Sequence, residues 1–191
     1  MIHEKIDCAE LILDINELAA RLSVRPGETV RDIDRYIDMI KSVAVPMYAA
    51  KHVHREKRGD GMYIGDIYTA SRGFMTVADG YSSCILLVVT LGLGVDKVIM
   101  RESAKSPSSA FILDAVADAY AEALCRYAEK KVTRGARSAP GFAPGYADLE
   151  LSVGEKIVKE IGADKLLGIR FTESGLMIPR KSISTIICTN I

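Results

Sequence analysis

The sequence lacks tryptophan, a Cys-x-x-Cys pair, any net charge and any hydrophobic run long enough to cross a bilayer. Its four cysteines are scattered at Cys8, Cys84, Cys125 and Cys188. This scatter excludes a cysteine-based zinc or iron–sulfur site at the usual ligand spacings. Cys84 and Cys125 lie in apolar runs, so we expect them to be buried thiols.

The balance of 25 Lys and Arg against 25 Asp and Glu argues against bulk electrostatic binding to nucleic acid. The longest nearly apolar run, from Cys84 to Val95, contains a Thr and two Gly and is shorter than the ~20 residues of a membrane span. The N-terminal segment carries His, Glu, Lys and Asp where a signal peptide needs an apolar block. We therefore expect a cytoplasmic protein with neither nucleic-acid nor membrane partners.

With 191 residues, of which 49% are hydrophobic, the chain can bury one domain core. We expect an N-terminal helical region over residues 1–46, joined to an α+β domain over 47–191 as one unit. In the first region, 11–22 predicts a short strand running into a helix. Thr29-x-x-Asp32 resembles a capping box, which predicts a second helix ending before Pro46.

The main domain alternates strand and helix signals. Residues 47–54 and 62–69 predict a hairpin around the polar turn 57–61, and 85–90 predicts a buried strand. A weaker helix signal covers 71–83, and Ser106 followed by Pro107 opens a long, Ala-rich helix to about Lys131. The predicted fold is α+β, an antiparallel sheet built from 47–69, 85–90 and 166–189 and packed with helices.

The segment from Gly141 to Thr185 carries most of the functional signal. Ala143-Pro144-Gly145-Tyr146 must form a turn, because Pro fixes its own φ and Gly accepts a positive φ. The alternatives are an ordinary surface turn and a ligand-binding loop. Ser152 and Glu155 predict a capping box for a helix that ends at Gly162. The strand predicted at 166–171 leads to the polar turn Thr172-Glu173-Ser174-Gly175, and 182–189 predicts a last strand.

Three other patterns could mark a functional site or could have an ordinary structural role. His52-Val53-His54 would place two imidazoles on one side of a strand, but nearby cations favour a solvated basic strand over a metal site. Gly92-x-Gly94 follows a strand, yet Lys97 stands where a dinucleotide fingerprint needs its third Gly. Asp114, Asp118 and Glu122 form an acidic stripe whose bland interpretation is a solvated helix face, which we expect for Asp118, whereas Glu122 is left open.

Two runs carry a family resemblance. Residues 143–151, A-P-G-Y-A-D-x-x-L, and 169–184, I-R-F-T-E-S-G-L-M-I-P-R-K-S-I-S, resemble the activation domain of cobalamin-dependent methionine synthase, and more closely its short stand-alone homologues. T-L-G-x-x-V-D after the buried strand is similar as well. The resemblance covers about residues 84–187.

The resemblance implies that the chain binds S-adenosylmethionine (AdoMet) and supports reductive methylation of a cobalamin held by a partner methyltransferase or corrinoid protein. A flavodoxin-like protein would donate the electron. The residues that it implies for the site are Ala143, Pro144, Gly145, Tyr146, Thr172, Glu173, Ser174 and, in an A-E-A segment, Glu122. An exposed Arg180-Lys181 pair would meet the carrier or the donor, or would simply be solvated.

One position departs from the family pattern. The family writes R-x-[AS]-P-G-Y, but Gly141 occupies the arginine position. Arg137 begins a second R-x-A-P-G-aromatic match four residues upstream, so we expect it to fold back toward the ligand carboxylate, because no Gly can replace a guanidinium. The alternative is an accessory module that binds a corrinoid or a nucleotide and has lost AdoMet.

Overall fold

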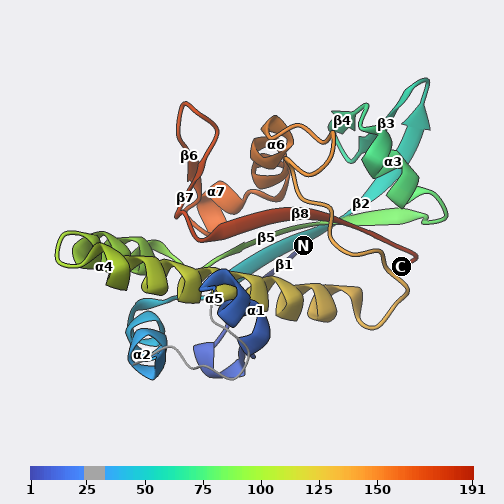
Figure 1. Ribbon diagram of the computed structural model, residues 1–191. Helices are drawn as coiled ribbons and strands as arrows, with labels where there is room; N and C mark the ends of the chain where they lie inside the picture. The colour runs from blue at the N-terminus through green and yellow to red at the C-terminus, as the bar shows by residue number, and fades with distance from the viewer. Residues whose placement is uncertain (24–32) are drawn as a thin grey trace.

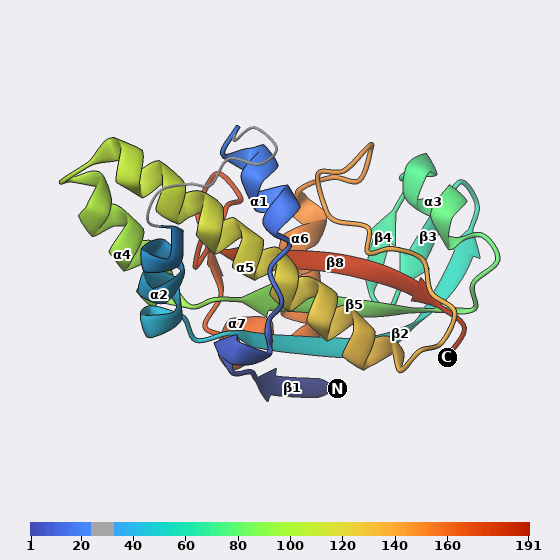
Figure 2. The same cartoon turned by 60° about the horizontal axis from the view of Figure 1, so that its bottom comes forward.

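A curled antiparallel sheet with helices on both faces forms the framework of the computed structural model, which describes residues 1–23 and 33–191 (Figures 1 and 2). Its strands are β1 (Ile2–Lys5), β2 (Met47–Arg58), β3 (Gly61–Ile64), β4 (Ile67–Thr69), β5 (Ser83–Thr90) and β8 (Ser182–Thr189). The order is β4-β3-β2-β5-β8, with β1 paired to β2. The α+β prediction is confirmed.

One face of the sheet carries 3₁₀ helix η1 (Cys8–Glu10) and helices α1 (Ile15–Arg21), α2 (Ile33–Val43), α4 (Leu93–Ser103) and α5 (Pro107–Thr133). The other face carries α3 (Arg72–Ala78), α6 (Ser152–Ile161) and α7 (Ala163–Leu166), together with a separate hairpin of β6 (Arg170–Phe171) and β7 (Met177–Ile178). Each face of the sheet has its own hydrophobic core. Strand β5 contributes to both, because alternate side chains of a strand point to opposite faces. Leu87 packs with α5, whereas Leu86 packs with α6.

The strongest local signals produced the expected elements. The Ser106 hydroxyl accepts a hydrogen bond from the Ser109 amide at 3.3 Å, and Pro107 is the first residue of α5. The predicted hairpin forms with Gly59 at φ +61° in its turn. The strand expected over 62–69 is nevertheless divided into β3 and β4, which pair with each other around Gly65 at φ +57°. The predicted buried strand corresponds to β5, in which every residue after Ser83 is buried. Each of these signals acts within a few residues, so the surrounding fold did not override it.

The N-terminal prediction was partly wrong. Residues 11–14 form no strand and lead directly into α1, where Asp14 accepts a hydrogen bond from the Glu17 amide at 3.0 Å. The strand lies earlier, at β1, whose side chains are mostly exposed and therefore show no apolar alternation. The predicted capping box at Thr29 and Asp32 lies outside the described residues. Leu18 and Ile40 are buried in the same core as α5.

Two C-terminal predictions were also wrong. The strand expected over 166–171 shrinks to β6, because helix α7 occupies Ala163–Leu166 and Gly168 then turns the chain at φ +68°. The main sheet therefore takes only β8 from the range 166–189. Ser152 is the first helical residue of α6 and caps nothing; its hydroxyl donates to Glu150 at 2.9 Å. The residues before α6 already form a turn, in which the Val153 amide donates a hydrogen bond to the Glu150 carbonyl.

Candidate functional site

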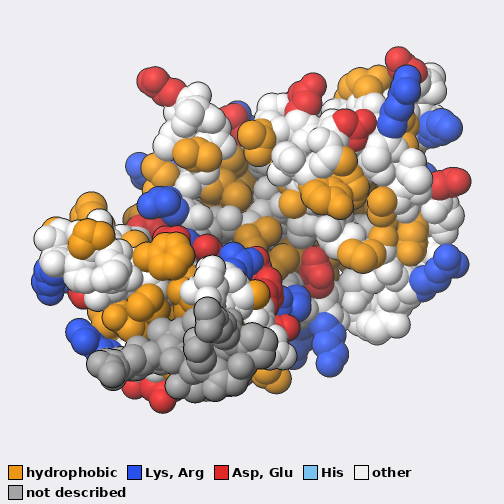
Figure 3. Space-filling view, in the orientation of Figure 1, with side chains coloured by type: hydrophobic (Ala, Val, Ile, Leu, Met, Phe, Trp, Pro, Cys, Tyr) orange, Lys and Arg blue, Asp and Glu red, His pale blue; other side chains and the backbone are white. Residues whose placement is uncertain are grey.

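A pocket of about 350 Å³ lies between the Ala143–Tyr146 turn, α6, the β6–β7 hairpin and the start of β8. It is lined by Pro144, Leu151, Gly154, Phe171, Gly175, Leu176, Met177, Arg180, Ser182 and Ser184. Hydrophobic side chains are visible in the space-filling view over the region where the hairpin and α6 face one another (Figure 3). Two segments that the sequence singled out, 143–146 and the hairpin, thus form opposite walls of one pocket.

The A-P-G-Y segment is a β-turn, as predicted. The Tyr146 amide donates to the Ala143 carbonyl at 3.1 Å, and Gly145 has φ +87°. A type II turn needs a positive φ at this third position and favours Pro at the second. A Cβ on Gly145 would also lie 2.8 Å from Leu151 Cδ2. Both the positive φ and the contact with Leu151 therefore favour glycine at position 145. The turn places Pro144 in the lining of the pocket.

Asp148 fixes this loop to α3. Its carboxylate accepts hydrogen bonds from the Ser71 hydroxyl and from the Arg72 and Gly73 amides, the latter two at 2.7 and 3.1 Å. The Ser71 hydroxyl first, and then these amides, hold the pKa of Asp148 below its usual value. The motif A-P-G-Y-A-D therefore includes an anchoring residue at its end.

Tyr146 lies at the outer end of an aromatic series. Its ring meets Phe142 edge-on, with centroids 5.3 Å apart, and Phe142 meets Phe74 at 5.7 Å. Phe142 also bridges to Ile186 of β8 through backbone hydrogen bonds. Tyr146 itself is 67% exposed and does not line the pocket, so its ring lies outside the core.

The polar triplet Thr172-Glu173-Ser174 shapes the hairpin turn. The Thr172 hydroxyl lies 2.8 Å from that of Ser174 and accepts from the Leu176 amide at 3.1 Å. None of the three side chains lines the pocket, which receives Phe171 and Gly175 to Met177 from this hairpin. The hairpin thus lies at the pocket, but the hydroxyls of Thr172 and Ser174 form hydrogen bonds within its turn.

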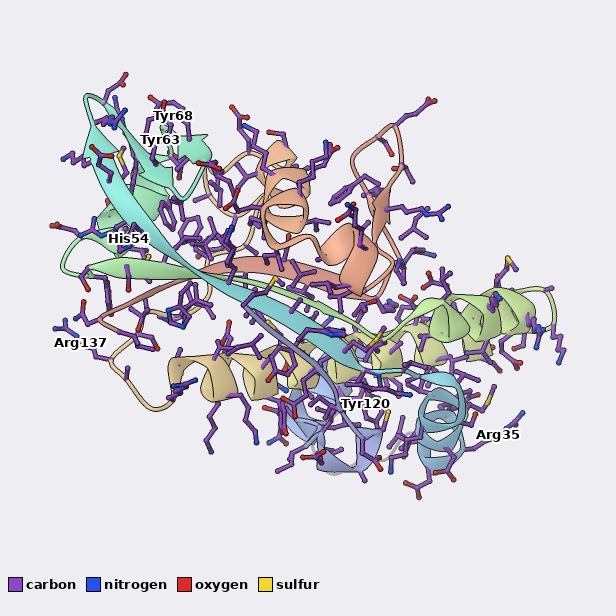
Figure 4. All side chains as sticks on the ribbon, turned by 180° about the vertical axis from the view of Figure 1, so that it is seen from behind. Arg35, His54, Tyr63, Tyr68, Tyr120 and Arg137 are labelled. Atoms are coloured by element: carbon purple, nitrogen blue, oxygen red, sulfur yellow. The ribbon has the colours of Figure 1, made fainter. Side chains whose placement is uncertain are left out.

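Arg137 lies elsewhere. Its guanidinium is 5.5 Å from the centroid of the Tyr81 ring, and its neighbour Ser138 bridges to Thr189 at the far end of β8. Ser184 in the pocket and Thr189 are separated by about 17 Å of strand, at about 3.4 Å per residue. Figure 4 shows Arg137 at the end of the sheet remote from the β6–β7 hairpin. The predicted fold-back of Arg137 to the pocket does not occur in this structure.

Gly141 is held where a side chain has no room. A Cβ there would lie 2.5 Å from Thr185 Oγ1 and would also overlap Glu129 Oε1. Burial raises the pKa of Glu129, and Thr185 Oγ1 is buried without a hydrogen-bond partner among the described residues. Position 141 thus excludes a larger side chain for a steric reason.

Glu122 is paired on the opposite face of the sheet. It contacts Arg21 of α1, and burial raises the pKa of its carboxyl. Because α1 and α5 cover the face opposite α6, the structure does not bring Glu122 to the pocket.

The acidic stripe is an ion-pair surface, contrary to the solvated face that we expected. Lys181 Nζ lies 2.9 Å from Asp114 Oδ1 and 2.6 Å from Asp118 Oδ1, and only 7% of its side chain is exposed. Lys181 is thus not the exposed cation that the sequence suggested. It points to the α5 face, because neighbouring residues of an extended segment alternate.

Arg180 is the pocket residue that the sequence reasoning undervalued. The sequence leaves open whether Arg180 meets a partner or is solvated; in the structure it is exposed and lines the pocket beside Met177 and Ser182. Its backbone amide donates to Asp96 Oδ2 at 2.9 Å. Arg180 is exposed and also lines a neighbouring pocket with Asp96 and Asp114, so it lies at the boundary between the two faces, whereas Lys181 is buried against α5.

The remaining patterns have structural roles. His52 and His54 share one side of β2, as predicted, and both are exposed. Among residues 1–23 and 33–191, no group of three or more His, Cys, Asp or Glu could hold a metal ion. Gly92 caps α4 at φ +79°, and Gly94 approaches the Val43 carbonyl too closely for a side chain. Cys84 is buried against Cys188, whereas Cys125 is half-buried.

The fold and the pocket together define an α+β protein with a small, largely apolar pocket on the α6 face of its sheet. Among solved structures, the chain is similar to the MetH reactivation domain bound to AdoHcy, with a TM-score of 0.73 over 99% of this chain and 78% of that one. At 15% identity this likeness shows the fold. No family model and no curated protein matches the sequence. None of the described helices is long and apolar enough to span a membrane.

Proposed function

We propose that this chain binds AdoMet or S-adenosylhomocysteine (AdoHcy) in the pocket beside the Ala143–Tyr146 turn and supports reductive methylation of a corrinoid held by a partner methyltransferase. One observation carries the proposal. Two segments that resemble the activation domain, within 143–151 and 169–184, form walls of one pocket. They do so in a fold similar to that of a domain bound to AdoHcy.

The pocket suits a ligand that needs positioning more than acid–base chemistry. Phe171, Leu151 and Met177 offer apolar surface, while Ser182 and Ser184 offer hydroxyls. Among the described lining residues there is no His, Lys, Cys, Asp or Glu to act as a general base. The partner's cobalamin would accept the methyl group and a separate donor would supply the electron, so this chain would contribute binding and orientation.

Exposed apolar side chains near the pocket favour binding of a partner protein on this face. Two large apolar side chains that line it are exposed, Leu151 at 66% and Leu176 at 63%, and Tyr146 of the adjoining turn is 67% exposed. Apolar side chains grouped at a pocket mouth are typical of an interaction site. The corrin macrocycle held by a partner protein could pack against this apolar surface. The proposed setting is cytoplasmic.

A second candidate function is an accessory module that holds a corrinoid or a nucleotide without AdoMet. The placement of Arg137 favours it, because the guanidinium expected to bind the amino-acid carboxylate lies beside Tyr81. The two candidates differ in one measurable property, which is affinity for AdoMet and AdoHcy.

Calorimetric titration with AdoMet and AdoHcy, with and without cobalamin, tests the proposal. Ligand at 100 times its dissociation constant should raise the free energy of unfolding by about 2.7 kcal/mol. For a chain of this size that corresponds to about 5–10 °C in Tm. The absence of a thermal shift at millimolar concentration of either ligand would overturn it, and binding of cobalamin alone would favour the accessory module.

A pocket-filling variant links binding to this site. A Cβ on Gly154 would point between Ser184 Oγ, at 3.3 Å, and Pro144 Cγ, at 3.7 Å. Gly154→Leu should therefore fill the pocket and abolish the thermal shift. Lys156→Leu is the matched control, since it adds the same side chain to an exposed position of α6. Equal ligand affinity of the two variants would place the ligand elsewhere.

A further inference from the structure

The pocket beside the Ala143–Tyr146 turn contains a single ionised side chain among its described lining residues, that of Arg180. The other lining residues are glycines, apolar side chains and the hydroxyls of Ser182 and Ser184. A guanidinium presents five N–H donors and no acceptor, in a planar fork that matches a carboxylate. The pocket is therefore built to receive a ligand with an anionic group.

Arg180 is held in place by its backbone, which leaves its side chain available. The amide donates to Asp96 Oδ2 at 2.9 Å and ties the residue to the first turn of α4. Within residues 1–23 and 33–191 the guanidinium forms no ion pair. Lys181 already neutralises Asp114 and Asp118 on the opposite face. Arg180 also lines a neighbouring pocket with Asp96 and Asp114, but neither carboxylate forms an ion pair with its guanidinium.

Other candidate cations cannot take this role. Arg137 lies against Tyr81 at the other end of β8. Position 141 cannot carry a side chain without displacing Thr185 and Glu129. Arg170 belongs to β6, close to the pocket in sequence, but it is exposed and does not line it.

We propose that Arg180 binds the carboxylate of the ligand's amino-acid tail, in place of an arginine at position 141. This inference rests on the proposed function, because it assumes that the ligand is AdoMet or AdoHcy. It assigns the anionic end of the ligand to the start of β8. The apolar walls formed by Leu151 and Phe171 then remain for the uncharged part of the ligand.

Titration of two ligands that differ only in the tail region tests the assignment. AdoHcy has the amino-acid carboxylate, whereas 5′-methylthioadenosine lacks the whole amino-acid group. Losing hydrogen bonds to a charged group weakens binding by about 10- to 150-fold. Arg180→Met should weaken AdoHcy binding by this factor and leave the affinity for methylthioadenosine unchanged. Arg180→Lys should recover part of the loss, since it retains the charge without the fork.

Arg170→Met is the matched control and should bind both ligands like the wild type. Circular dichroism and Tm of each variant check that it folds. If Arg180→Met binds AdoHcy as tightly as the wild type, or loses both ligands equally, the role of Arg180 is refuted while AdoHcy binding by the wild type still upholds the proposed function. If the wild type binds neither ligand, the proposed function fails first and the role of Arg180 fails with it.

Discussion

Replacing Gly141 tests whether this position excludes a side chain. A Cβ there would lie 2.5 Å from Thr185 Oγ1 and would overlap Glu129 Oε1. Thr185 is on β8, 2% exposed and packed between β5 and α5, so its side chain has little free space to move into. The Glu129 carboxyl is the end of a longer side chain and can move. The cost of Gly141→Ala should therefore arise mainly at Thr185.

The magnitude follows from two opposing effects. Overpacking a well-packed site costs about 1–3 kcal/mol. Replacing Gly by Ala restricts the unfolded chain and returns about 0.4–1 kcal/mol. We expect Gly141→Ala to destabilise the protein by about 1–2 kcal/mol, which lowers Tm by about 2–8 °C. Gly141→Arg carries the same Cβ, so we expect it to lose stability without restoring a carboxylate anchor.

Urea unfolding followed by circular dichroism measures this cost, and a double-mutant cycle identifies its source. In a Thr185→Ala background, Gly141→Ala should cost at least about 0.5 kcal/mol less, because the obstructing hydroxyl is gone. Gly154→Ala is the control, since its closest contact is the rotatable Ser184 hydroxyl at 3.3 Å, and its stability should be unchanged or slightly higher. If Gly141→Ala unfolds at the same urea concentration as the wild type, the steric argument is refuted.

Three further predictions concern the loop and the helices. Tyr146→Ala should leave Tm within about 1 °C, because the ring is 67% exposed, while weakening reactivation of the partner; a large fall in Tm with normal activity would make Tyr146 a core residue. Because the pKa of Asp148 is lowered in the folded state, its stabilisation is present above about pH 4 and is lost as pH falls through the lowered value. Urea unfolding of Asp148→Asn should therefore differ most from wild type at neutral pH and converge with it in acid, and a pH-independent difference would contradict this. Gly94→Ala should lower Tm by several degrees, because its Cβ would overlap the backbone carbonyl of Val43; an unchanged Tm would show that α2 and α4 can separate at no cost.

Local sequence determined the elements whose causes lie within a few residues. The Ser106-Pro107 start of α5, the A-P-G-Y turn and the buried strand β5 all follow from φ restriction, capping and apolar runs. The two segments that form the pocket could be named in advance for the same reason, since turn chemistry marks them. The sequence could not show that the two segments lie close together. The β6–β7 hairpin and the Ala143–Tyr146 turn line one pocket because α6 and β8 also pack there.

Tertiary structure decided which charges belong to the site. Arg180 and Lys181 are adjacent and alike in sequence, yet Lys181 is buried against Asp114 and Asp118, whereas Arg180 is exposed and lines the pocket. Arg137 matched the motif letters but lies at the far end of the same strand. The side of a sheet that a residue faces depends on strand register and on what packs there, and both are set by partners distant in the chain.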